Sequence, residues 1–147
     1  MNEKQYFEEI QEELISKICL DNRVDIDNLH AIAGVDLAYW KQKDKEYACC
    51  CIVVLDYTDF SIIEKKHSVG EITVPYIPGC LAFREYDLVE KTVSLLENKV
   101  DLFAFDGNGY LHLRHMGLAT YAGIMLEKPS RNDIGTVLMS CFPFNLR

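Results

Sequence analysis

The sequence predicts an α/β protein in which a mixed β-sheet is flanked by helices. In the first half, three apolar segments follow one another with short polar turns between them, a pattern typical of antiparallel strands. In the second half, a helical pattern, a short apolar strand and another helical pattern alternate, which adds a strand covered by helices. With 147 residues, 49% hydrophobic and 26% charged, the chain suits one domain spanning residues 1–147.

The first half begins with a helix and continues as three strands. Phe7, Ile10, Leu14 and Ile18 recur every three or four residues, which places them on one face of a helix. After the turn-forming segment DNRVDIDN we expect strands in AIAGVDLAYW (31–40), YACCCIVVLDY (47–57) and the longer, half-exposed FSIIEKKHSVGEITVPY (60–76).

The second half adds two helices around one strand. Val89, Val93 and Leu96 mark the apolar face of a helix in YDLVEKTVSLLENK (86–99). VDLFAFD (100–106) is apolar on both sides, as a strand covered on both faces would be. MGLATYAGIMLEK (116–128) predicts a closely packed helix rich in small residues, and Pro129 marks its end.

The net charge of −8 and the isoelectric point near 4.9 exclude binding of nucleic acid by general attraction, because each phosphate contact needs Lys or Arg. A metal-dependent nuclease is still compatible with this charge, since its metal supplies the local positive field. No apolar run approaches the roughly 20 residues that span a bilayer. The acidic, amphipathic start is neither a signal nor a transit peptide, so we expect a cytoplasmic protein that does not bind membranes.

Six cysteines without a signal peptide indicate a reducing compartment. Cys49, Cys50 and Cys51 are consecutive in a predicted strand, where neighbouring side chains point to opposite faces. They lack the C-x-x-C spacing of zinc and redox motifs, so we interpret them as packing residues.

Three acidic residues are candidates for a site. Asp36 interrupts an apolar strand and Asp106 ends another, where an unpaired buried carboxylate would cost several kcal/mol. Such oxygens suit a hard cation such as Mg²⁺. The alternative is structural, with each aspartate bonded to backbone amides or to an Arg. Glu85 lies directly before the predicted helix at 86–99, at its N-terminal end. It could be a metal ligand, or it could complement the positive end of the helix dipole there. Beside it, Arg84 could pair with Glu85 or Asp87, or reach a phosphate.

The segment VPYIPG holds Tyr76 and Ile77 between Pro75 and Pro78, with Gly79 after them. Because both prolines stiffen the backbone, the loop would suit a wedge that enters a base stack. The alternative is an ordinary turn whose Tyr and Ile pack into the core.

A basic cluster follows the second aspartate and its glycines. His112, Arg114 and His115 could donate to phosphate oxygens or shuttle a proton. Histidines without such a setting are usually structural.

In order and spacing, four segments resemble endonuclease V, the deoxyinosine-specific repair nuclease of the ribonuclease H-like superfamily. They are QEELISKI (11–18), AGVDLAY (33–39), VPYIPGCLAFRE (74–85) and DGNGYLHLRHMGLATYAGIMLEKPS (106–130). The resemblance implies a ribonuclease H-like mixed sheet flanked by helices. It also implies Mg²⁺-dependent hydrolysis of the phosphodiester one nucleotide 3′ of deoxyinosine, or of inosine in RNA, with Mn²⁺ as a substitute for Mg²⁺.

The resemblance also assigns roles to residues of this chain. The metal ligands would be Asp36, Glu85 and Asp106, which with His112 near the substrate phosphate form the catalytic group. Tyr76 would be the wedge that fills the stack after the base is flipped out. The segment and pocket that hold the flipped base would consist of Ile77, Pro78, Gly79, Leu81, Gly107, Gly109 and Leu118.

The last segment departs from the family. After EKPS the family continues as TIGVAK or similar, with a lysine beside the active site and several further elements. Here SRNDIGTVLMSCFPFNLR follows, with Gly135 in the position of that lysine. We interpret residues 130–147 as an atypical, truncated or frameshifted tail. We then expect a sheet without its last elements, a metal site short of one ligand, and apolar surface that aggregates or is hidden in a homodimer.

Two functions remain open at this point. One is a Mg²⁺-dependent repair endonuclease, and the other is a catalytically impaired remnant that only binds inosine-containing nucleic acid. A metalloenzyme acting on another class of substrate is disfavoured, because a stiff Tyr-Ile wedge would have no use there.

Overall fold

Five strands form one mixed sheet in the order β3-β2-β1-β4-β5. The computed structural model describes residues 2–21 and 24–132, so the atypical tail from 133 onward, including Gly135, lies outside the described residues. β4 is parallel to β1 and β5 is parallel to β4, whereas β1, β2 and β3 are antiparallel. The bounds are β1 Ala31–Gln42, β2 Lys45–Asp56, β3 Ile62–Glu71, β4 Leu102–Phe105 and β5 Ser130–Asn132. The predicted α/β class is confirmed.

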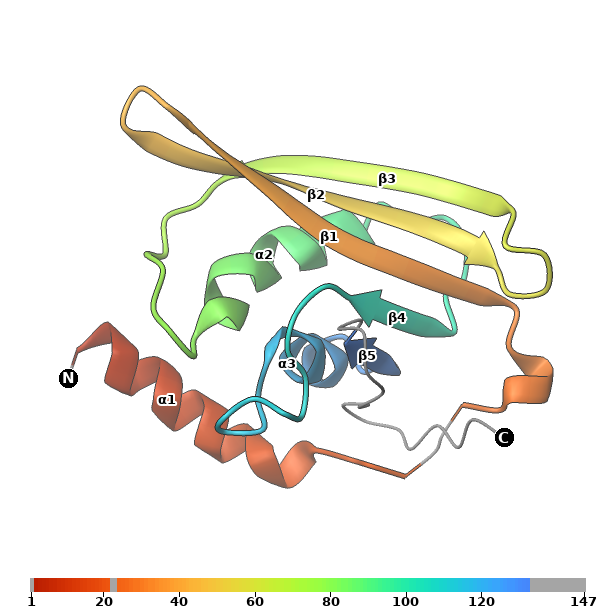
Figure 1. Cartoon of the computed structure of the whole chain (residues 1–147), viewed down its shortest axis with the longest axis horizontal. Coiled ribbons are helices and arrows are strands. Elements are labelled where there is room, and N and C mark those ends of the chain that lie inside the picture. The colour runs from red at the N-terminus through yellow and green to blue at the C-terminus, as the bar shows by residue number, and fades with distance from the viewer. Residues whose placement is uncertain (1, 22–23, 133–147) are drawn as a thin grey trace.

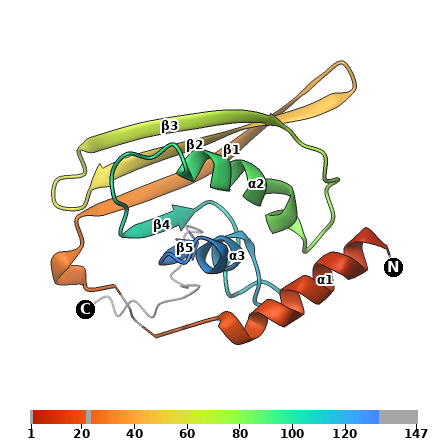
Figure 2. The ribbon, with the colours of Figure 1, turned by 180° about the vertical axis from the view of Figure 1, so that it is seen from behind.

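Three α-helices lie on one side of this sheet (Figure 1). They are α1 Glu3–Leu14, α2 Leu81–Val93 and α3 Leu118–Met125, and short 3₁₀ helices occupy Ile15–Lys17 and Ile26–Asn28. The view from behind shows α2 beneath β2 and β3, with α3 beside β4 and β5 (Figure 2). The predicted order of helix, three strands, helix, strand and helix is confirmed. No helix of the described chain is long and apolar enough to cross a membrane.

Some boundaries differ from the prediction. β3 ends at Glu71, before the proline-flanked loop that the apolar pattern had joined to it. α2 begins at Leu81, five residues earlier than predicted, so Glu85 lies in its second turn and not at its start. β5 was not predicted, because its three residues are too few for a periodicity.

Alternate residues of the central strands face the helices. On β2 the inward residues Ala48, Cys50, Ile52 and Val54 are all fully buried. Cys49 and Cys51 point to the opposite face, as the alternation predicted. The packing interpretation holds for Cys50, whose pKa burial raises to about 11, but Cys51 is exposed.

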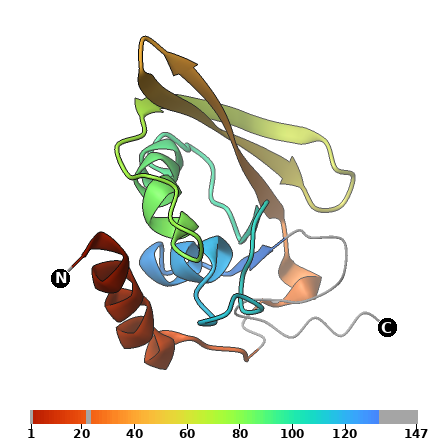
Figure 3. The same ribbon diagram turned by 60° about the vertical axis from the view of Figure 1, so that its left-hand side comes forward.

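The face of the sheet turned away from the helices is called the outer face below. A turned view shows no α-helix of the described chain on it (Figure 3). Side chains on this face include Trp40, Cys51 and Val69, of which Trp40 and Val69 are 39% and 47% exposed. Apolar side chains are therefore partly exposed on this face in the described part of the chain. The bare apolar surface expected from the atypical tail stays a prediction. The homodimer that would hide it stays a prediction.

Glu64 on β3 ties the sheet to the chain that follows α2. Its carboxylate accepts hydrogen bonds from the backbone amides of Glu97 and Asn98, at 2.9 and 3.0 Å, and from Asn98 Nδ2 at 2.9 Å. Lys66 lies 3.5 Å from the same carboxylate. The bonds from Asn98 and Glu97 lower the pKa of Glu64 to about 2, from an ordinary 4.5.

A Glu64→Gln variant should therefore unfold at a temperature a few degrees lower at pH 7. Because the pKa is lowered in the folded state, the stabilisation is present above pH 4.5 and is lost as pH falls toward 2. Thermal unfolding of both proteins at pH 7, 5 and 3 should show the difference shrinking. A difference independent of pH would contradict the assignment. Glu71→Gln, which breaks only an exposed ion pair with Lys45, is the control and should change little.

Candidate functional site

Asp36 and Asp106 meet where β1 and β4 part. The parallel register runs from Ile32↔Leu102 to Val35↔Phe105, so the two aspartates are the next residues on their strands. The backbone amide of Asp106 still donates to Val35 O at 3.3 Å. Both side chains are exposed and line an open hollow of about 590 Å³ on the outer face. We call this hollow the acid cavity, and its lining is Gly34, Val35, Asp36, Cys51, Val53, Ala104 and Asp106.

Glu85 approaches the same corner from α2. It is only 5% exposed and accepts a hydrogen bond from the phenol of Tyr39. Burial raises the pKa of Glu85, and the charges of Asp36 and Asp106 raise it further. Glu85 thus feels the charges of both aspartates, although it does not line the acid cavity. In the described residues, no three His, Cys, Asp or Glu side chains yet surround a single point at metal distance.

Arg84 pairs with neither Glu85 nor Asp87. Its guanidinium pairs with Glu46 at 2.6 Å and donates to Val74 O at 2.6 Å. It also lies 5.1 Å from the centre of the Tyr39 ring. Arg84 therefore anchors the loop before α2. The predicted ion pair of Arg84 with Glu85 or Asp87 is wrong, because Glu46 on β2 is its partner.

A second, smaller cavity, called the small pocket, lies around the starts of α2 and α3. Its volume is about 120 Å³. It is somewhat smaller than a cavity of roughly 150 Å³ that holds benzene, so its enclosed part has the size of a single six-membered ring. Its lining is Tyr76, Gly79, Leu81, Ala82, Asn108, His112, Met116, Gly117 and Leu118. Five residues predicted from two separate segments are thus brought together: Tyr76, Gly79, Leu81, His112 and Leu118.

Four other predicted residues do not line the small pocket: Ile77, Pro78, Gly107 and Gly109. Gly107 has φ +154°, which few side chains tolerate, and packs against Leu118. The carbonyl of Gly109 accepts hydrogen bonds from the amides of His112 and Gly117, at 3.1 and 3.2 Å. The glycines therefore shape the loop 106–109, which contributes Asp106 to the acid cavity and Asn108 to the small pocket.

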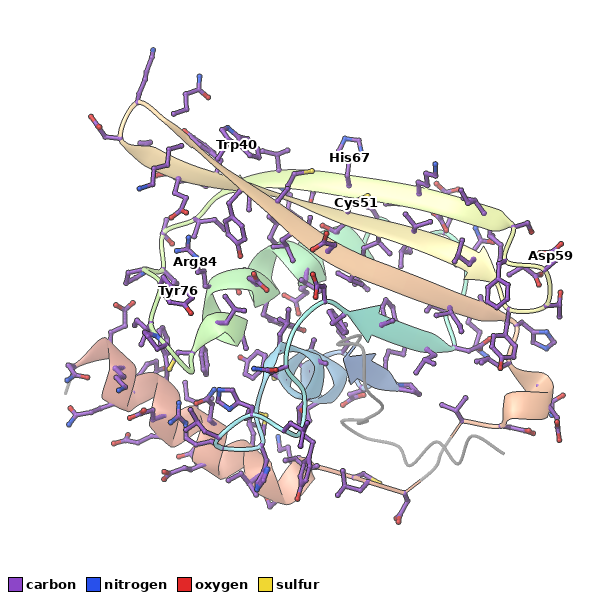
Figure 4. All side chains as sticks on the ribbon, viewed as in Figure 1. Trp40, Cys51, Asp59, His67, Tyr76 and Arg84 are labelled. Atoms are coloured by element: carbon purple, nitrogen blue, oxygen red, sulfur yellow. The ribbon has the colours of Figure 1, made fainter. Side chains whose placement is uncertain are left out.

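Tyr76 projects into solvent at the mouth of the small pocket. Its side chain is 68% exposed, and Figure 4 shows it on the loop between β3 and α2. The alternative that Tyr76 packs into the core is wrong, because Arg84 holds Val74 and leaves the following residues on the surface. Ile77 is half-buried.

The basic cluster divides into three different settings. His112 is 9% exposed, and its Nδ1 accepts the backbone amide of Arg114 at 3.2 Å. Burial lowers the pKa of His112, so the neutral ring carries its proton on Nε2. His115 is exposed and stacks on Tyr110. Of the three, only His112 lines a cavity near the predicted site.

Arg114 is held inside the protein. It pairs with Glu8 at 3.0 Å and donates to Gln11 Oε1 at 2.7 Å and to Gly79 O at 3.0 Å. The expectation that Arg114 reaches a phosphate does not fit these contacts. They fix α1 against the loop that carries Gly79.

Gln11 is a residue that the sequence reasoning missed. It is completely buried, and its Nε2 donates to Gly79 O at 2.9 Å and to Met116 O at 3.1 Å. Both carbonyls belong to residues that line the small pocket. A polar residue four positions after Phe7, on the apolar stripe of α1, was the available signal.

Comparison with known proteins decides the family. The model of the family described as Endonuclease V matches residues 12–135. The chain belongs to the endonuclease V family. An endonuclease V of Clostridium acetobutylicum is 52% identical over 127 residues, and one of Bacillus subtilis is 47% identical over 130 residues. These matches cover 86% and 88% of this chain but 54% and 55% of the relatives, so the chain spans about half of their length.

Solved structures of endonuclease V share the fold. The Bacillus subtilis structure superposes with a TM-score of 0.86 at 46% identity, covering 94% of this chain and 58% of that one. A Ciona intestinalis endonuclease V bound to a 24mer DNA containing an inosine superposes at 0.80 with 27% identity, covering 87% of this chain and 56% of that one. The predicted ribonuclease H-like mixed sheet with flanking helices is confirmed.

Proposed function

We propose that this chain carries a metal-dependent nuclease site that hydrolyses the phosphodiester one nucleotide 3′ of deoxyinosine, or of inosine in RNA. One observation carries the proposal: the loop 106–109 contributes Asp106 to a cavity lined by two exposed carboxylates and Asn108 to a small enclosed pocket. A nuclease that reads a flipped base needs those two sites side by side. The inosine-containing DNA bound to the Ciona relative supports the choice of base.

The donor set fits a hard divalent cation. Asp36 and Asp106 offer exposed carboxylate oxygens. Burial is the main cause of the raised pKa of Glu85, and the charges of Asp36 and Asp106, which a cation would offset, add to it. Asp36, Glu85 and Asp106 would hold Mg²⁺, which when bound supplies Lewis acidity and lowers the pKa of a water molecule. Tyr39 positions Glu85 through its phenol hydrogen bond.

The chain's own residues would recognise the base and hold the strand. The small pocket is enclosed by Leu81, Met116 and Leu118, and Gly79 lets the backbone approach the edge of the base. The Nε2 proton of the neutral His112 is a donor for a base or phosphate oxygen. Tyr76 would stack in the gap that the base leaves.

The proposal is tested with a duplex that contains one deoxyinosine, alongside the same duplex with deoxyadenosine at that position and an inosine-containing RNA. Nicking that requires Mg²⁺ and is absent from the deoxyadenosine duplex is the expected result. The RNA arm decides between DNA and RNA. Tight, inosine-dependent binding without nicking would replace the nuclease by a binding module. If a folded chain neither nicks nor prefers inosine, the proposal is wrong.

A Tyr76→Ala variant should bind the deoxyinosine duplex roughly 10–100-fold more weakly, because an aromatic stacked on a base contributes about 1–3 kcal/mol. Fluorescence anisotropy with Ca²⁺ in place of Mg²⁺ measures the affinity without cleavage. The control is Phe60→Ala, which removes an aromatic of similar exposure, 65%, from the β2–β3 turn. Equal losses in the two variants would contradict the wedge assignment.

A further inference from the structure

Four potential metal ligands form one row across the outer face of the sheet. The β2–β3 register pairs Cys51 with His67, and the β1–β2 register pairs Cys51 with Asp36. Because residues paired across strands point to the same side, His67, Cys51 and Asp36 all project from the outer face. Asp106 follows the last β1–β4 pair and continues the row. A side chain from each of β3, β2, β1 and the end of β4 therefore lies at the same level.

The row changes in chemical character along its length. Asp36 and Asp106 offer hard carboxylate oxygens, whereas Cys51 and His67 offer the softer sulfur and nitrogen donors that Zn²⁺ prefers. Cys51 is at the centre of the second group and also lines the acid cavity. The proposed nuclease site uses neither Cys51 nor His67.

The softer half of the row is accessible and uncommitted in the described part of the chain. The side chains of Asp36, Cys51 and His67 are all exposed, and Figure 4 shows Cys51 and His67 beside each other on neighbouring strands. Among the described residues, Cys51 and His67 have no hydrogen-bond or ion-pair partner, and Asp36 uses one oxygen, which accepts the amide of Leu37 at 2.8 Å. Ordinary pairing and burial therefore do not account for them.

Cross-strand spacing allows the three side chains to reach one ion. Paired residues have Cβ atoms roughly 4.5–5.5 Å apart, so an ion above Cys51 lies within reach of both neighbours. In their present rotamers, no three His, Cys, Asp or Glu side chains of the described residues surround a single point at metal distance. Exposed side chains change rotamer on the picosecond to nanosecond timescale, so rotation about χ1 can bring them together.

We propose that Asp36, Cys51 and His67 bind Zn²⁺ or another thiophilic divalent cation, with water as the fourth ligand. Three protein ligands and one water form the usual open tetrahedral site. The Cys51 thiol loses its proton to solvent when the ion binds. Asp36 belongs to this site and to the proposed Mg²⁺ site, so Zn²⁺ withdraws it from the latter and suppresses cleavage. Only that last consequence rests on the proposed function.

The same strand supplies a matched control. Cys49 lies two residues before Cys51, on the same face, but its paired residues are Ala38 on β1 and Val69 on β3. Its row therefore contains a thiol without a second ligand. A Cys49→Ser variant removes one sulfur from the outer face and leaves the proposed site intact.

The test uses the full chain with Zn²⁺ in calorimetry and Co²⁺ as a spectroscopic probe of thiolate ligation. The wild-type chain should show a Co²⁺–thiolate charge-transfer band that Zn²⁺ abolishes. Cys51→Ser should lose the band, and Cys51→Ser and His67→Ala should each weaken Zn²⁺ binding by roughly tenfold or more. Cys49→Ser should retain the band and the affinity. Circular dichroism of each variant establishes that it is folded.

Three results would contradict the proposed Zn²⁺ site. They are an absence of Zn²⁺ binding by the folded wild type, a charge-transfer band that persists in Cys51→Ser, and loss of the band in Cys49→Ser to the same extent as in Cys51→Ser. Asp106→Asn separates this proposal from the nuclease proposal: it should retain Zn²⁺ binding but not Mg²⁺-dependent cleavage. If the chain cleaves, Zn²⁺ should inhibit the wild type at least tenfold more strongly than Cys51→Ser.

Discussion

An Asp106→Asn variant is expected to lose Mg²⁺-dependent nicking of a deoxyinosine duplex by roughly 10³-fold or more. Metal stabilisation of transition-state charge is worth several kcal/mol, and each 1.36 kcal/mol is a factor of ten. The substitution keeps the size of the side chain but removes the charge. The side chain of Asp106 makes no hydrogen bond with any described residue, and only its backbone amide donates one, to Val35 O. The substitution should therefore leave the folded structure unaffected. Single-turnover kinetics at saturating duplex measure the loss, and unchanged thermal unfolding shows that it is chemical.

The control for Asp106 is Asp44→Asn at the tip of the β1–β2 hairpin. This exposed aspartate has φ +65°, a conformation that asparagine also tolerates. It makes the same change in net charge far from both cavities, so nicking should stay within about twofold of wild type in the salt-dependent range. A loss in Asp44→Asn similar to that in Asp106→Asn would mean that the effect is one of overall charge. Full activity of Asp106→Asn would remove this residue from the proposed metal site.

The largest effect on stability is expected from Gly117→Ala, at the start of α3. A Cβ atom there would lie 2.1 Å from the carbonyl oxygen of Asn108 and 2.9 Å from that of Gly109. The backbone conformation is ordinary, with φ −74°, so the penalty is steric and falls on backbone atoms that cannot rotate away. Overpacking costs roughly 1–3 kcal/mol and more where relaxation is blocked, and we expect about 3 kcal/mol here. The thermal midpoint should fall by roughly 10 °C.

Gly34→Ala is the matched control for Gly117→Ala. A Cβ atom at Gly34 meets no atom within 4 Å, because this residue faces the open side of β1. Alanine there should leave the midpoint unchanged or raise it slightly, since glycine weakens a strand interior. Gly117 and Asn108 both line the small pocket, so Gly117→Ala should also weaken inosine-dependent binding. A midpoint for Gly117→Ala within about 1 °C of wild type would contradict the close approach of these two segments.

Local patterns were sufficient for most of the fold. The helix at α1, the three antiparallel strands and the β4–α3 unit follow from apolar spacing and from turn residues, which act over a few positions. The end of β3 and the start of α2 were harder to predict from the sequence. The segment between them is held by Arg84, which donates to Val74 O and pairs with Glu46 on β2, and these contacts are not visible in a local pattern. β5 depends on pairing with β4, which no pattern of three residues reveals.

The candidate site was only partly visible in the sequence. Asp36 and Asp106 could be found because one interrupts an apolar strand and the other ends one. A carboxylate in such a position costs free energy unless it has a partner or a ligand. Gln11 and Arg114 could not be assigned, because their side-chain hydrogen-bond partners lie 68 to 105 residues away for Gln11 and 34 to 103 for Arg114. Tyr76 had two opposite readings, and its 68% exposure decided between them.

The sequence by itself therefore determined the kinds of element, their order and the identity of the acidic and aromatic candidates, because propensity and periodicity are properties of neighbouring residues. Only the tertiary structure decided which candidates share a cavity, and that Cys51 stands between Asp36 and His67. A cross-strand neighbour is set by register, and register results from burying one whole face of the sheet against α2 and α3. Such a neighbour can lie at any distance along the chain, so no local pattern encodes it.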